Sequence, residues 1–340
     1  MRNSIRTGIA LAAILLAVAP GARADAVADF YKGRQMTILL GTGPGRTYDL
    51  YARMLANHIV NHIPGKPRAI VQYMPGAGGL KATNYLYNAA PKDGAMIATL
   101  FATLPSIRLF KPEAAKYEPL KFGWLGAFSR TVNVVIVNKG APATTLADAK
   151  KKEVVIGSIG KGNTTYQFPA LINGAFGTRF KIISGYRSGG AIYKAMEGGE
   201  VHGYAPVWLS VVATKAAALK SGDIRVLVQG GLSRLPELPD VPLLLDLAET
   251  DEQRGMIRFL SAGSPLGRAA QGPPGMPKDR YEAMVSALAA MVKDPAYLAE
   301  ARKLKLSVAF TSRDDTVAAV RQIMETPPAV IARLRTVMGY

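Results

Sequence analysis

Short apolar runs alternate with amphipathic segments along most of this chain, and the alternation predicts strands followed by helices. Residues 47–63 place Leu50, Met54, Leu55 and Ile59 on one face at helical spacing. Residues 132–137 lack polar alternation, as expected for a strand covered on both faces. We expect strands at 35–40, 69–73, 95–100, 132–137, 154–157, 179–183 and 224–229, with a short one near 306–310. We expect helices at 47–63, 80–88, 166–176, 191–198 and 209–221, and over most of the chain from residue 278 onward.

This order of elements is typical of an α/β fold, in which helices cover a mostly parallel sheet. The stretch 235–242 contains Pro236, Pro239 and Pro242 and is predicted to return the chain from one domain to another. We therefore expect two domains. The first is discontinuous, 25–127 plus 233–340, and the second covers 128–232.

Four of the predicted strands run into a glycine-rich loop that leads to a predicted helix. The loops cover 41–47, 74–79, 157–164 and 185–190. Glycine allows main-chain N–H groups to come close to a ligand, and a helix N-terminus adds partial positive charge there. If the loops converge, they form an anion site built mostly from main chain. That arrangement indicates binding rather than catalysis.

The first 24 residues have the features of a secretory signal peptide. Arg2 and Arg6 precede an apolar stretch at 9–18, and Ala22-Arg23-Ala24 is a small-x-small cleavage site. An uncleaved membrane anchor is the alternative, but a span needs ~20 apolar residues. We expect cleavage near Ala24 and a periplasmic mature protein that begins at Asp25.

Composition narrows the possible functions further. The chain has no cysteine, which excludes lipid attachment, disulfides, thiolate metal sites and cysteine nucleophiles. Its formal net charge is +18, or +15 without residues 1–24, which carry three arginines and no acid. Such a charge favours encounters with anions. The basic residues are scattered, without a basic stripe that interleaves aromatics, so we expect no nucleic-acid partner.

Known catalytic and nucleotide-binding motifs do not fit this sequence. The phosphate-loop and dinucleotide patterns that start at Gly41 require glycine where Arg46 stands, and Gly162 follows Lys161 where Ser or Thr is needed. His58 and His62 have zinc-ligand spacing, but Ile59 replaces the catalytic Glu, so we expect two solvated histidines. There is no Gly-x-Ser-x-Gly elbow. We expect that the protein is not an enzyme and that it binds no metal and no cofactor.

Five segments in order resemble the motifs of the tripartite tricarboxylate transporter receptors, also called Bug proteins. The segments are 43–53, 71–79 with its Pro-Gly-Ala-Gly-Gly, 90–94, 157–164 and 185–201. The resemblance implies a periplasmic solute receptor with two α/β domains and a ligand cleft between them, a type II periplasmic-binding-protein-like fold. It implies small carboxylate ligands, a large and a small membrane subunit as partners, and a monomer without cofactor. A ligand-presenting protein for a periplasmic sensor is the first alternative, and a hydrolase is the second.

Residues of these loops are our candidate ligand contacts. They are Thr42, Gly43, Arg46, Thr47, Asp49, Gly78, Gly160, Gly162, Asn163, Thr164, Tyr186, Ser188, Gly189 and Trp208.

Several of these candidates have an alternative explanation. Arg46 stands where the family has glycine, and it either pairs with a second ligand carboxylate or is solvated. Asp49 either stabilises a helix N-terminus capped by Thr47 or faces the cleft. Trp208 is either core or an aromatic wall of the site. His202 replaces a family Asp, which puts the role of that Asp in doubt here.

Overall fold

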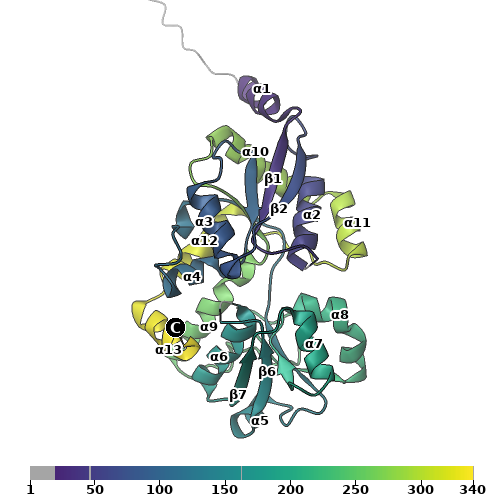
Figure 1. Ribbon diagram of the computed structural model, residues 1–340, viewed down its shortest axis with the longest axis vertical. Helices are drawn as coiled ribbons and strands as arrows, with labels where there is room; N and C mark the ends of the chain where they lie inside the picture. The colour runs from purple at the N-terminus through teal and green to yellow at the C-terminus, as the bar shows by residue number, and fades with distance from the viewer. Residues whose placement is uncertain (1–19, 46, 162, 340) are drawn as a thin grey trace, which may run out of the picture.

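The computed structural model describes residues 20–45, 47–161 and 163–339, and it contains two five-stranded sheets in separate lobes (Figure 1). The first sheet has the order β2 (Arg68–Tyr73), β1 (Gln35–Leu40), β3 (Met96–Thr99), β10 (Ala269–Gly272) and β4 (Gly123–Ala127). The second has the order β7 (Phe180–Ser184), β6 (Val154–Ser158), β8 (Gly203–Tyr204), β5 (Val134–Asn138) and β9 (Ile224–Gln229). The fold is a two-domain α/β architecture.

In each sheet four strands run in one direction and one strand runs in the other. In the first, β2, β1 and β3 are parallel, and β10 is antiparallel to both β3 and β4. In the second, β7, β6 and β8 are parallel, and β5 is antiparallel to both β8 and β9. The carboxyl ends of three neighbouring strands therefore lie at one edge of each sheet.

Helices cover both faces of the sheets. In chain order they are α1 (Pro20–Tyr31), α2 (Thr47–Ile59), α3 (Leu80–Asn88), α4 (Leu104–Phe110), α5 (Leu146–Lys151), α6 (Thr164–Phe176), α7 (Gly189–Glu197), α8 (Trp208–Ser221), α9 (Asp251–Ala262), α10 (Lys278–Met291), α11 (Pro295–Lys303), α12 (Arg313–Met324) and α13 (Pro328–Met338). Three short 3₁₀ turns lie at Ala77–Gly79, Pro119–Lys121 and Ser264–Leu266. Within the described parts of the chain, no helix has the length and apolar composition needed to cross a bilayer.

Burial on both faces explains the uninterrupted apolar run at the end of β1. Ile38 and Leu40 of β1 belong to a core that includes Tyr51 and Leu55 of α2, whereas Leu39 belongs to a second core on the other face. An uninterrupted apolar strand is the pattern that such a two-sided layer requires.

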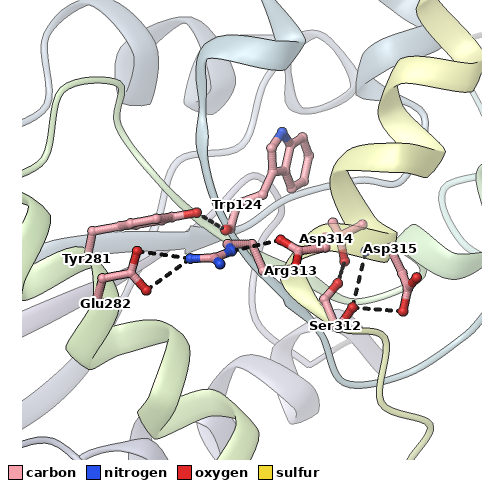
Figure 2. Close-up of polar contacts among 8 residues, drawn as sticks. Trp124, Tyr281, Glu282, Ser312, Arg313, Asp314 and Asp315 are labelled. Carbon is pink, nitrogen blue, oxygen red and sulfur yellow. Dashed lines mark hydrogen bonds and ion pairs between the residues drawn. The ribbon is translucent and has the colours of Figure 1, made fainter.

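Polar contacts join helix α12 to α10, and α10 to β4 (Figure 2). Nη1 of Arg313 donates to both carboxylate oxygens of Glu282, at 3.0 and 2.9 Å, and its Nε donates to Asp314 at 3.0 Å. The hydroxyl of Tyr281 donates to the carbonyl of Trp124 in β4 at 2.7 Å. These contacts orient the C-terminal helices on the first sheet.

The predicted strands and helices are largely present, with two corrections. The helix predicted at 47–63 ends at Ile59, because a turn leads into Pro64 and Gly65. The strand predicted near 306–310 is absent: a single bridge joins Thr311 to Ala127. Elements that the pattern did not predict include α1, α4, α5, α9, β4 and β10.

The predicted domain boundaries stay a prediction, but the contacts refine them. Strands β5 to β9 all lie within 128–232. Two segments that the prediction assigns to the first domain contact the second: the N–H of Leu244 donates to Gln229 in β9 at 2.8 Å, and α13 packs on α6. Leu244 directly follows the connector at 235–242, so the chain does not leave the second lobe at once, and α13 contacts that lobe again near the C-terminus.

Candidate functional site

The loops at the carboxyl edge of the first sheet contact one another. A β-carbon added at Gly41 would lie 3.2 Å from Cα of Gly79, and one added at Gly79 would lie 2.6 Å from the ring of Phe101. Phe101 in turn packs edge-on against Tyr48, with ring centroids 4.8 Å apart. The ends of β1, β2 and β3 and the start of α2 therefore form one surface, and glycine is required at 79 for Phe101 to lie there.

The carboxylate of Asp49 holds the first glycine loop in place through hydrogen bonds. Its Oδ2 accepts the N–H of Gly45 at 2.8 Å, and its Oδ1 accepts from the hydroxyl of Tyr73 at 2.6 Å and from Nε of Arg53 at 3.0 Å. Burial raises the pKa of Asp49, but the hydrogen bonds from Tyr73, Gly45 and Arg53 outweigh it and lower the pKa. The buried carboxylate is engaged within the protein, which favours a helix-terminal role over contact with a ligand.

Two predicted contacts of the second lobe are helix caps. The side chain of Asn163 accepts the N–H of Thr165 at the start of α6, and Ser188 accepts the N–H of Ala191 at the start of α7. Gly189 begins α7 where a β-carbon would lie 2.5 Å from the hydroxyl of Tyr204. These residues fix the N-termini of α6 and α7 at the carboxyl edge of β6, β7 and β8.

The segment 128–133 connects the two edges. The N–H of Arg268 donates to Ser129 at 3.0 Å, on the first-lobe side. On the other side, the side-chain amide of Asn133 donates to the hydroxyl of Thr164 at 3.1 Å, and the N–H of Trp208 donates to Val132 at 2.7 Å. A cavity of about 30 Å³ lies at this connection, lined by Asn133 and Thr164 among others. The two carboxyl edges therefore meet at the connecting segment.

The remaining predicted contacts lie on the same loops. Thr42, Gly43 and Thr47 are half-buried between β1 and α2, and Gly160 is half-buried with an open space where a β-carbon would stand. Gly78 is exposed and also faces open space. Arg46 and Gly162 lie outside the described residues, so their predicted roles stay predictions.

The two aromatic candidates of the second lobe are half-buried. Trp208 starts α8 and packs against the apolar core around Val134, Ile192 and Tyr204, so it contributes to the core. Tyr186 lies after β7, and burial, with the charge of Glu200, raises its pKa. Tyr186 is therefore a neutral hydroxyl donor at neutral pH.

Sequence reasoning missed three residues of the first edge: Tyr48, Phe101 and Arg268. The guanidinium of Arg268 lies 3.6 Å from the ring centroid of Tyr48, and the hydroxyl of Tyr48 donates to the carbonyl of Gly267 at 3.2 Å. Tyr48 lay inside a quoted motif and Phe101 directly after a predicted strand. Arg268 lies in no motif. The only signal in the sequence is a basic residue directly before two apolar ones, Ala269 and Ala270.

The prediction of two solvated histidines was wrong. Nε2 of His58 in α2 lies 2.6 Å from Oε2 of Glu300 in α11, and Nε2 of His62, in the turn after α2, lies 2.9 Å from Oδ2 of Asp294 before α11. Their side chains are only 11% and 22% exposed. Among the described residues no group of three or more His, Asp or Glu side chains has the arrangement of a metal site.

Comparisons with known proteins give the fold a family. A UPF0065 protein of Bordetella bronchiseptica is 24% identical over 326 residues, covering 92% of this chain and 88% of that protein. The periplasmic binding protein BugD is structurally similar with a TM-score of 0.66, at 20% identity, covering 91% of this chain and 99% of that one.

Two further similar structures carry ligands in their descriptions. Rpa4515 of R. palustris, described with adipate, has a TM-score of 0.65 at 19% identity, covering 90% of this chain and 97% of that one. MatC of Rhodopseudomonas palustris, described with bound malate, has a TM-score of 0.64 at 19% identity, covering 90% and 99%. At these identities the likeness establishes the two-domain fold.

Residues 51–335 match the family described as tripartite tricarboxylate transporter family receptor, which is most of the chain. The chain belongs to this family of substrate-binding receptors, which are not enzymes.

Proposed function

We propose that this receptor captures a small organic acid between its two lobes and delivers it to a secondary transporter with a large and a small membrane subunit. The observation that carries the proposal is the meeting of the two carboxyl edges at the segment 128–133. The start of α6 is tied to this segment by the hydrogen bond of Asn133 to Thr164. The start of α2 is tied by the hydrogen bond of Tyr48 to Gly267, where an added β-carbon would lie 2.7 Å from the main chain of Arg130.

The chemistry of these edges favours an anion. Helices α2, α6, α7 and α8 all begin there, and the free N–H groups of a helix N-terminus attract negative charge. The formal net charge of +18 adds a long-range attraction. Adipate and malate in the descriptions of two similar structures are consistent with a dicarboxylate ligand here.

The periplasmic location of this particular chain rests on its first 24 residues. We propose that they are a signal peptide cleaved near Ala24, as the charged start, short apolar run and small residues predict. Mass spectrometry of the mature protein from the periplasmic fraction of an expressing bacterium tests this. A first residue at or near Asp25 supports cleavage, and an intact N-terminus contradicts it.

The ligand is tested by native purification followed by mass spectrometry of the small molecules released on denaturation. The proposal expects an organic acid at about one molecule per chain. A nucleotide or a peptide in that amount contradicts it. Delivery is tested with proteoliposomes that contain the two membrane subunits: uptake of the identified acid depends on this receptor if it serves a transporter, and is unchanged by it otherwise.

A further inference from the structure

Arg268 is a buried arginine with an unusual set of neighbours. It is 4% exposed, and its guanidinium lies 3.6 Å from the ring centroid of Tyr48 and 5.0 Å from that of Tyr51. Its Nη1 donates to the carbonyl of Gly267 at 2.6 Å. Its Nε is buried and has no hydrogen-bond partner among the residues that the structure describes.

No acidic side chain pairs with Arg268 in the described parts of the chain. Other arginines here do have such partners: Arg53 pairs with Asp49 and Arg313 with Glu282. A buried charge is unfavourable unless it is paired and hydrogen-bonded, and the faces of two tyrosine rings compensate only part of that energy. The guanidinium of Arg268 can therefore bind an anion, and no acidic side chain of the described chain fills that role.

The side chain of Arg268 lies at the candidate site. Arg268 precedes β10, which runs antiparallel to β3 with Ala270 opposite Thr99. The start of β10 therefore lies beside the end of β3, at the same edge as the glycine loops. Tyr48, over which the guanidinium lies, is the second residue of α2 and touches Phe101.

We propose that the guanidinium of Arg268 is the counter-charge for a carboxylate of the ligand, and that it makes the receptor select acids over the neutral amides of the same shape. This inference rests on the proposed function and assigns its charge recognition to one residue. A bidentate guanidinium–carboxylate pair supplies both attraction and orientation, and it satisfies the unpartnered Nε.

The chain offers a matched control in Arg280 of α10. Its guanidinium lies 3.7 Å from the ring centroid of Phe30, its Nη1 donates to the carbonyl of Asp93 at 2.7 Å, and its Nε is likewise buried without a partner in the described structure. Asp93 precedes β3, so Arg280 lies near the opposite end of that strand. Arg280→Met removes the same kind of stacking without touching the candidate site.

The experiment is calorimetric titration of wild type, Arg268→Met and Arg280→Met with succinate, adipate and benzoate and with the matching amides. For the acids that bind wild type, we expect Arg268→Met to raise the dissociation constant about 10- to 100-fold, as for a lost hydrogen bond to a charged group. We expect amides to bind weakly and to be changed far less, and Arg280→Met to bind like wild type.

The outcomes separate this inference from the proposed function. If Arg268→Met binds the acids as tightly as wild type, the inference is overturned while the receptor function stands. If wild type binds none of these acids and releases none on denaturation, both are overturned. If Arg268→Met does not fold, a crystal structure of wild type with its acid decides: a carboxylate at the guanidinium of Arg268 supports the inference, and one elsewhere overturns it.

Discussion

The carboxylate of Asp49 accepts the main-chain N–H of Gly45 at 2.8 Å, so the first turn of α2 holds the glycine loop that precedes it. Gly45 has a φ of +80°, a conformation that glycine adopts without strain. The shape of the loop therefore depends on the side chain of Asp49, four residues further along. Asp49 shapes the site by holding the loop, not by contacting a ligand.

We predict that Asp49→Ala lowers the free energy of unfolding by about 1–3 kcal/mol, because Gly45, Tyr73 and Arg53 lose a charged acceptor in a buried place. Chemical denaturation measures this. Asp29→Ala is the control, since Asp29 is exposed on α1 and its loss is expected to change stability little. If the two substitutions lower the free energy of unfolding equally, Asp49 does not stabilise the loop as proposed.

The same carboxylate predicts a pH dependence. The pKa of Asp49 is lowered from 3.8 in the folded protein, so the stability it contributes is complete above pH 3.8 and is lost as the pH falls through the folded value. The difference in unfolding free energy between wild type and Asp49→Asn should therefore be constant near neutral pH and shrink below pH 3.8. A difference that grows on acidification contradicts this sign.

Gly79 and Gly78 form a second matched pair. Both have positive φ, +93° and +65°, but a β-carbon at Gly79 meets the ring of Phe101 at 2.6 Å, whereas one at Gly78 meets open space. Gly78→Ala should cost about 1–2 kcal/mol through backbone strain alone. Gly79→Ala should add about 1–3 kcal/mol of overpacking and displace Phe101 from Tyr48. Denaturation and titration with the ligand check this, and ligand binding unchanged in Gly79→Ala argues against Phe101 as part of the site.

His58 tests whether the contact of α2 with α11 depends on packing or on polar pairing. The ring lies edge-on to Tyr297 at 5.5 Å, Nε2 meets Glu300, and Nδ1 is buried without a partner in the described structure. His58→Phe keeps the ring contact and removes the unpaired nitrogen, so we expect a change below about 1 kcal/mol. His58→Ala should cost about 1–3 kcal/mol. If His58→Phe costs as much as His58→Ala, the polar contact with Glu300 rather than the ring holds α11.

Two-lobed receptors of this kind are expected to close on their ligand. Segment 128–133 is one of the segments that join the lobes, and we expect the lobes to rotate relative to each other about it. Small-angle scattering with and without a saturating acid should show a smaller radius of gyration in its presence. Identical curves contradict closure.

The sequence predicted strands such as β1 because their apolar run is buried on both faces, with Ile38 and Leu39 in opposite cores. It missed β10 and β4 because they are short and rich in Ala and Gly, and because their pairing joins residues far apart in the chain: Ala270 lies opposite Thr99. Arg268 could not be found for the same reason. It reaches the site only because β10, which follows it, pairs with β3 far back in the chain.

Among the loop residues, pattern alone did not separate caps from contacts. Asn163 and Ser188 are predicted ligand contacts in the glycine loops, and their side chains cap α6 and α7. Polar residues that precede a helix serve either purpose. Only the hydrogen bonds of the folded chain show which groups are already engaged.

Thermal unfolding with mono-, di- and tricarboxylates, and separately with ATP, tests the central claim most directly, because a ligand stabilises the state that binds it. An acid at about 100 times its dissociation constant should add about 2.7 kcal/mol to the stability of the folded protein. We predict that at least one carboxylate raises the melting temperature and that ATP does not. A rise with ATP and none with any of the acids would contradict a carboxylate receptor.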